Sequence, residues 1–339
     1  IVVLKEIVLT AGVTVAADKV VVLDLNGNTI SMQDASGAGA YAIKNNGSLT
    51  IKDSDEGGKG GKITFNSTTP DNSFGYATST IGNGGHLTIE NGLIENTTVG
   101  GASYAVDGIW HTGEASLTIN GGTMVAKKVA VRQVPFSATA KNTVTINGGT
   151  FTGETAGLQM FNINNEAKLS ETNIYGGTFN GTYAFYTSFT SAQASELATI
   201  NIDGGTFNGY VYLYNGNNGS NEYPMTVAIT DGLFNSVAYI YTKDANGNEV
   251  PIKAIKGGTF SEDPTNYCAD GYSPIFNGST YTVIQVSGTQ TRSLQAGWNW
   301  FSSYVDLSQE GGLVKLQTAL DKSGLAIKGQ TGNQSVQYG

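Results

Sequence analysis

The sequence is poor in several residue types, and each shortage restricts what the chain can be. Cys268 is its single cysteine, so no disulfide can form within the chain. Only 6 of the 339 residues are proline, and charged residues make up 13% of the chain. The fold must therefore hold without internal disulfides, and uncharged polar residues must form most of its surface.

Positive charge is also scarce. Lysine and arginine together number 18 against 27 acidic residues, which gives a net charge of −9, and the two arginines are Arg132 and Arg292. Such a chain is poorly suited to neutralise phosphates, so we expect neither nucleic acid nor an anionic membrane surface as a partner. No apolar run reaches the roughly 18 residues of a membrane-spanning helix, so we expect no transmembrane segment.

Glycine, by contrast, is abundant and regularly spaced. The chain has 46 glycines, about twice the usual share. One glycine of a repeated motif, written "INGGTF" in its clearest form, stands at Gly92, Gly122, Gly149, Gly177, Gly205, Gly232 and Gly258. These positions lie 26 to 30 residues apart, and a period of this length is typical of a solenoid.

Each repeat combines strand-like alternation with a glycine turn. In "TVTINGGTF", the apolar Val144 and Ile146 alternate with polar residues, and Phe151 follows the glycine pair. Alternation indicates a β-strand, and glycine permits the positive φ of a tight corner. We therefore predict an all-β fold over residues 1–286, a right-handed parallel β-helix with three sheets and coils of about 26–30 residues.

Stacked coils should place equivalent residues in columns about 4.8 Å apart. Two inward columns follow from the repeat. We expect one to contain Ile119, Ile146, Ile174, Ile202, Ile229 and Ile255, and the other to contain Met124, Phe151, Phe179, Phe207, Phe234 and Phe260.

Residues 287–339 break this pattern. Their strand-like segment "GTQTRSLQAGWNWFSSYVDL" has no glycine corner, and "GLVKLQTALDKSG" places leucines at helical spacing. We predict a small α+β module here, which need not be complete at its C-terminal end. Trp298 and Trp300 point to one face of its strand, and we expect them to pack in its core.

The segments "VTVAADKVVVLDLNGNTI", "GSLTIKD" and "LTINGGTM" resemble the pectin-lyase-like right-handed β-helices of secreted surface proteins from gut Bacteroidetes. "SLQAGWNWFSSYVDLS" resembles a C-terminal module of large Bacteroidetes surface proteins. The resemblance implies a secreted or cell-surface location. The family includes polysaccharide lyases and hydrolases, but also adhesin-like proteins without known catalysis, so the resemblance does not decide the activity.

The residues give little sign of catalysis. Asp203 and Asp231 lie near the same turn on adjacent coils, but carboxylates at turns usually bond local N–H groups. Asp53 and Asp55 in "DSDEGG" have the spacing of a calcium loop without its closing glutamate. Two histidines are too few for a histidine-rich zinc site. We therefore expect no cofactor and no metal, and we assign no catalytic residue.

A second alignment predicts an outward face. Taking Val106, Val131, Leu158, Phe185, Leu213 and Ile240 as an inward column places the next residue of each coil outside. The outward column is then Asp107, Arg132, Gln159, Tyr186, Tyr214 and Tyr241, flanked by Tyr212 and Tyr239. We expect a surface ion pair between Asp107 and Arg132 beside a platform of five tyrosines.

This face has three possible roles. Tyrosine combines an apolar ring with a hydroxyl, which suits a glycan, and Asp107, Arg132 and Gln159 would then hydrogen-bond to it. The tyrosines could instead form a purely structural cross-strand ladder, or contact a protein partner. We predict a noncatalytic adhesin-like surface protein that presents this face to glycans or to another cell-surface ligand. The alternatives are a polysaccharide lyase or glycoside hydrolase, and a structural spacer.

Overall fold

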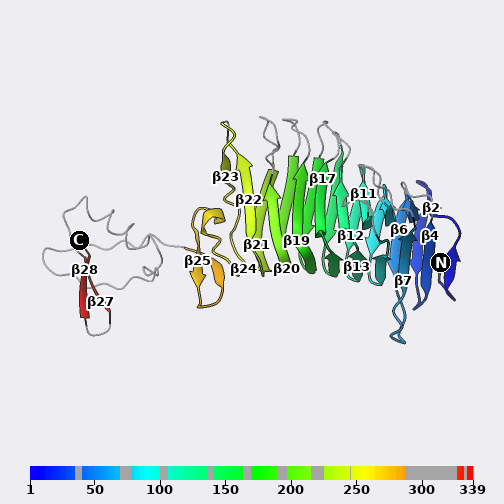
Figure 1. The fold of residues 1–339 in the computed structure, drawn as a ribbon, viewed down its shortest axis with the longest axis horizontal. Helices are drawn as coiled ribbons and strands as arrows, with labels where there is room; N and C mark the ends of the chain where they lie inside the picture. Colours follow the sequence, from blue (N-terminus) through cyan, green and yellow to red (C-terminus); the bar gives the residue numbers. More distant parts are fainter. Residues whose placement is uncertain are drawn as a thin grey trace. The chain divides into compact units, whose positions relative to one another are not determined.

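The computed structural model describes residues 1–34, 40–68, 78–99, 106–135, 140–162, 169–189, 197–214, 225–244, 246–286, 327–331 and 334–338. The chain divides into two compact units, Ile1–Ile284 and Gln285–Gly339. The first unit is a parallel β-solenoid, as the repeats predict, and its strands lie side by side in Figure 1.

Three stacks of parallel strands form the solenoid. The first contains β3 (Val20–Asp24), β6 (Ser48–Lys52), β9 (His86–Ile89), β12 (Ser116–Ile119), β15 (Lys141–Ile146), β18 (Leu169–Ile174) and the beginnings of β20 (Leu197–Tyr214) and β21 (Met225–Phe234). The second contains β1 (Ile7–Leu9), β4 (Thr29–Asp34), β7 (Lys62–Ser67), β10 (Leu93–Asn96), β13 (Thr123–Ala126), β16 (Thr150–Gly153), the beginning of β19 (Thr178–Phe189), the middle of β20, the end of β21 and β24 (Thr259–Phe260). The third contains β2 (Val13–Val15), β5 (Tyr41–Asn45), β8 (Thr78–Asn83), β11 (Val106–Thr112), β14 (Val129–Val134), β17 (Ala156–Asn162), the ends of β19 and β20, and β22 (Ala238–Lys243).

The parallel pattern changes in the last described part of the solenoid. Strand β23 (Glu249–Pro251) pairs antiparallel with β22, and β26 (Tyr281–Gln285) pairs antiparallel with β24. A short 3-10 helix, η1 (Thr265–Tyr267), and β25 (Tyr272–Phe276) lie between them in sequence.

In the second unit, the described residues form an antiparallel pair, β27 (Ile327–Thr331) and β28 (Gln334–Tyr338). The predicted helix of this module and both of its tryptophans lie outside the described residues. In the part of the chain that the structure describes, no helix has the length and apolar character needed to cross a membrane.

Both predicted inward columns are confirmed. The six isoleucines pair in register from coil to coil, and each is fully buried. The five phenylalanines also pair in register behind Met124. Their rings stack at centroid separations of 4.4–5.0 Å and interplanar angles of 4–8°. Repetition of the same letters therefore builds one continuous stack through the core.

The repeated glycine occupies a corner that other residues do not fit. Gly149, Gly177 and Gly205 have φ values of 103°, 99° and 102°, a region that L side chains rarely adopt. The coils also approach closely here, since a Cβ on Gly122 would lie 2.6 Å from the carbonyl oxygen of Gly92. Backbone conformation and coil spacing therefore both require glycine at this position.

The core also contains a polar row that the sequence analysis did not identify. Asn45 donates to the Asn83 side-chain oxygen at 2.8 Å, and Asn83 donates to His111 Nδ1 at 2.9 Å. His111 Nε2 then donates to the carbonyl oxygen of Thr143 at 3.0 Å. The three side chains are buried, and burial lowers the pKa of His111 to about 3. This imidazole is therefore neutral at physiological pH.

The phenylalanine stack should dominate the stability of its coils. We expect Phe179→Ala to lower the free energy of unfolding by about 3–5 kcal/mol, because it opens a cavity between two stacked rings. Tyr175→Ala is the matched control, since Tyr175 is in the same coil but 53% exposed; its effect should stay below about 1 kcal/mol. Chemical denaturation of both variants tests this, and equal losses would contradict the role of the stack.

His111 should make the solenoid sensitive to acid. Its pKa is about 3 in the folded chain against an ordinary value of 6.5, so between these values the unfolded chain binds the proton more tightly. The contribution of His111 to the free energy of unfolding is therefore fully present above pH 6.5. It falls by about 1.4 kcal/mol per pH unit as the pH decreases toward 3.

Denaturation from pH 7 to pH 4 measures this contribution. In His111→Gln the part of the pH dependence that begins near 6.5 should disappear, whereas the exposed His86→Gln should retain it. An unchanged pH profile in His111→Gln would show that another group is responsible.

Candidate functional site

The third stack carries the aromatic and charged residues that the sequence singled out. One column runs through consecutive coils in the order Trp110, Arg132, Gln159, Tyr186, Tyr212 and Tyr239. Its character changes along the solenoid, from a polar and aromatic cluster on β11, β14 and β17 to tyrosines on β19, β20 and β22.

The tyrosines form a contiguous surface, which we call the tyrosine face. It consists of seven partly or largely exposed side chains: Tyr183, Tyr186, Tyr210, Tyr212, Tyr214, Tyr239 and Tyr241. Centroids of neighbouring rings are 4.5–6.2 Å apart. Tyr210 and Tyr239 are 41% and 39% exposed. The face therefore spans three strands and is open to solvent.

Tyr212 lies at the centre of this face. Its ring centroid is 5.7 Å from that of Tyr186 and 6.0 Å from those of Tyr214 and Tyr239, at interplanar angles of 53–60°. The buried phenylalanines stack nearly parallel, but these outer rings are tilted against each other. Tilted and edge-to-face contacts of this kind stabilise the group of rings.

The structure corrects the register of the tyrosines. The alignment by sequence placed Tyr186 in a column with Tyr214 and Tyr241, but it pairs with Tyr212 and Tyr239. The alignment was wrong by two residues, and a shift by two leaves each side chain on the same side of its strand. All five predicted tyrosines are therefore on the tyrosine face.

Sequence alignment missed Tyr183 and Tyr210, which pair with each other. The ladder between β19 and β20 is irregular on both sides of Tyr183, and such an irregularity interrupts simple alternation. The signal was present in the letters: "GTFNGTYAFY" and "GTFNGYVYLY" match when two residues of the first segment, one before and one after Tyr183, are left without a partner.

The predicted ion pair exists, but its predicted surface location is wrong. Arg132 Nε and Nη2 donate to the two Asp107 carboxylate oxygens, each at 2.8 Å, and Nη1 donates to Gln159 Oε1 at 2.5 Å. The Arg132 and Asp107 side chains are 1% and 0% exposed, and Gln159 is buried as well. These three residues are therefore not available on the surface for a ligand.

Aromatic side chains explain this burial. The Arg132 guanidinium carbon lies 5.9 Å from the ring centroid of Trp110 and 5.6 Å from that of Phe161. These two rings pack with Val134, and Tyr41 packs against the same cluster. Burial raises the pKa of Asp107, the Arg132 charge opposes this rise, and burial together with the Asp107 charge raises the pKa of Tyr41 to about 12.

The physical reason for the error is again register. Sequence alignment placed Val106 opposite Val131, whereas Ile109 occupies that position and Asp107 pairs with Val129. Trp110 is therefore the true neighbour of Arg132 in its column. Because the alignment did not place the Trp110 ring beside Arg132, it predicted an exposed Asp107–Arg132 pair.

The two candidate carboxylates at the turns are neighbours, as predicted. Asp203 pairs in register with Asp231 on the next coil. Asp203 Oδ1 accepts a hydrogen bond from the Thr230 hydroxyl, and Asp231 Oδ1 accepts one from the Gly232 N–H at 2.7 Å. Asp231 therefore makes the local N–H contact that the sequence favoured, whereas Asp203 bonds to a hydroxyl on the next coil.

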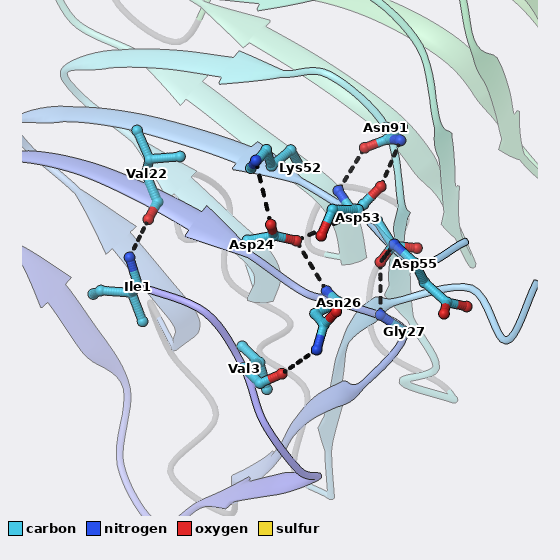
Figure 2. A network of polar contacts seen from close by, with 11 residues as sticks. Ile1, Val3, Val22, Asp24, Asn26, Gly27, Lys52, Asp53, Asp55 and Asn91 are labelled. Carbon is cyan, nitrogen blue, oxygen red and sulfur yellow. Dashed lines mark hydrogen bonds and ion pairs between the residues drawn. The ribbon is translucent and has the colours of Figure 1, made fainter. Parts of the chain in front are cut away.

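The two aspartates of the "DSDEGG" loop accept hydrogen bonds from backbone N–H groups. Asp53 accepts from the Gly27 N–H at 2.7 Å, and Figure 2 labels both residues. It also accepts from the Gly61 N–H at 2.5 Å, so it links two segments of backbone. Asp55 accepts from three N–H groups of its own loop, those of Gly57, Lys59 and Gly60. These oxygens close the loop, and among the described residues no set of three or more His, Cys, Asp or Glu side chains is arranged to hold a metal ion.

Comparisons of the chain with protein-family models, with curated proteins and with solved structures gave no match. The function must therefore be argued from the geometry of the face itself.

Removing one partner of the buried Asp107–Arg132 pair should destabilise the fold more than removing both. We expect Arg132→Met to lower the free energy of unfolding by about 3–5 kcal/mol, because it leaves the Asp107 carboxylate buried without a partner. An Asp107→Leu/Arg132→Met double variant should lose much less. A double-mutant cycle by chemical denaturation measures both, and a single variant no less stable than the double variant would contradict the account.

Proposed function

We propose that this chain is a noncatalytic, adhesin-like protein, secreted or on a cell surface, that binds glycans on its tyrosine face. The observation that supports this most strongly is the contiguous set of tilted, partly exposed tyrosine rings over β19, β20 and β22. A contiguous exposed aromatic patch often marks a binding surface.

The chemistry of tyrosine fits a sugar. Each ring offers an apolar surface for the C–H groups of a sugar ring, and each hydroxyl offers a hydrogen-bond donor and acceptor for its hydroxyl groups. The parallel strands beneath hold the rings in fixed columns, so little side-chain or backbone order has to be gained on binding. Such preorganisation favours affinity.

A purely structural ladder explains the tyrosines less well. The buried phenylalanines stack at 4–8°, whereas the outer pairs around Tyr212 are tilted by 53–60°, and both arrangements stabilise neighbouring strands. Exposure separates the two sets of rings, since Tyr210 and Tyr239 are 41% and 39% exposed. This exposure favours a surface that a ligand completes, whether the ligand is a glycan or part of a protein.

The extracellular part of the proposal rests on sequence. The repeats resemble pectin-lyase-like β-helices of secreted proteins, and the "GWNWF" segment resembles a module of Bacteroidetes surface proteins. The enzymatic alternative, a polysaccharide lyase or glycoside hydrolase, is less favoured. Asp107 and Arg132 pair with each other and are buried. Asp203 accepts from the Thr230 hydroxyl on the next coil, and Asp231 accepts from an N–H group of its own turn.

Affinity gel electrophoresis against a panel of plant and host polysaccharides tests the proposal. We expect at least one polysaccharide to retard the native chain, and the Tyr212→Ala/Tyr239→Ala double variant to lose about 10-fold or more in affinity. Tyr175→Ala is the matched control, because Tyr175 is exposed but belongs to the first stack; it should bind normally.

The same mixtures, assayed for new reducing ends and unsaturated sugars, separate binding from catalysis. Retardation without products supports the proposal. New products would overturn its noncatalytic part, and normal binding by the double variant would place the glycan on another surface. No retardation across the panel would favour the structural spacer or a protein ligand.

A further inference from the structure

The buried state of Arg132 has a consequence for the kind of glycan that the tyrosine face can bind. An anionic glycan needs a cation within reach, and arginine is the side chain best suited to pair with its carboxylate or sulfate groups. Both acceptors of Asp107 already occupy Arg132, which is 1% exposed. Arg132, the one arginine among the described residues, is therefore not available to a ligand.

Negative charge, in contrast, lies at one edge of the tyrosine face. Strand β23 pairs antiparallel with β22 and places Pro251 opposite Tyr241 and Glu249 opposite Lys243. Glu249 is exposed. Burial and then the charge of this carboxylate raise the pKa of Tyr212 at the centre of the face, so the field of Glu249 reaches the rings.

The loop of the same hairpin carries a second carboxylate. Asp244 accepts hydrogen bonds from the backbone N–H groups of Asn246 and Asn248 at 2.9 and 2.8 Å, and from the Asn248 side chain at 3.1 Å. These bonds lower the pKa of Asp244, so this carboxylate is ionised at neutral pH. The hairpin, residues 243–251, thus carries two acidic residues, Asp244 and Glu249, against one lysine, Lys243, in a chain whose net charge is −9.

We infer that the tyrosine face selects neutral glycans over anionic ones, and that Glu249 is a specificity-determining residue for this choice. The inference rests on the proposed glycan binding. A neutral sugar contacts the rings and their hydroxyl groups without an electrostatic cost. A uronate, sulfate or sialate group would approach a surface edged by carboxylates, and like charges placed together suppress binding of the wrong partner.

The experiment compares matched polymers that differ in charge. The probes are hydroxyethyl cellulose with carboxymethyl cellulose, dextran with dextran sulfate, and highly methyl-esterified pectin with de-esterified pectin, together with any polysaccharide that the panel retains and its own carboxymethylated derivative. Binding is measured at low ionic strength and again in high salt, because exposed charges are screened beyond about 10 Å at 0.1 M salt.

Glu249→Lys is the informative variant. Relative to the native chain it should improve the ratio of anionic to neutral binding by roughly 5-fold at low salt, and high salt should remove most of this gain. Glu249→Gln should give a smaller shift in the same direction. Glu262→Lys is the control, since it changes the net charge equally from an exposed position beyond β24; it should leave the ratio unchanged.

The outcomes separate the two proposals. Loss of neutral binding in Tyr212→Ala/Tyr239→Ala, combined with the Glu249→Lys shift, supports both. If the tyrosine variant loses binding but the native chain retains the anionic polymers as strongly as the neutral ones, glycan binding stands and the inference is overturned. An equal shift in Glu262→Lys would also overturn it. If no polymer is retained by the native chain, the proposed function itself fails.

Discussion

The in-register stacking of one coil on the next is the constraint on which the rest of this structure depends. Each coil repeats the spacing of the previous one, so each side chain meets its own counterpart about 4.8 Å away. Inside, this produces a stack of phenylalanines from Phe151 to Phe260 and a column of six isoleucines. Glycine at the corner keeps the spacing constant, because a Cβ there would strike the coil below.

The same stacking also determines the outer surface. The tyrosine face exists because three strands repeat aromatic residues at equivalent positions, and the rings around Tyr212 are tilted against each other. Toward the earlier coils the same column changes to Gln159, Arg132 and Trp110, whose side chains close into a buried cluster. Burial of one charge pair thus leaves an uncharged aromatic surface next to it.

The sequence predicted most of the fold because glycine marks each coil from Gly92 to Gly258. The motif around Gly149 and Gly177 fixed the register of the first two stacks, and both inward columns were confirmed. The third stack lacks such a marker, so its register had to be predicted from the alternation of apolar and polar residues alone. The predicted register was wrong by two residues at Tyr214 and by three at Val106. The shift by two still placed the tyrosines on the outward side, whereas the shift by three put Asp107 in the position beside Arg132 that Trp110 occupies.

The burial of polar side chains was the other feature that the sequence did not predict. An alternating pattern assigns polar residues to the outside, yet Asn45, Asn83 and His111 are buried and bonded to each other. Their hydrogen bonds join residues 28 and 38 positions apart in sequence, so only the stacking of coils reveals them. The pKa of His111 follows from that burial and not from any local motif.

The most direct test of the central claim is a crystal structure of the chain with an oligosaccharide from the polymer that it retains most strongly. The account predicts a sugar ring packed on Tyr212, with further units over Tyr186 or Tyr239 and no contact with the buried Arg132. An oligosaccharide bound on the first or second stack, away from these tyrosines, would contradict it.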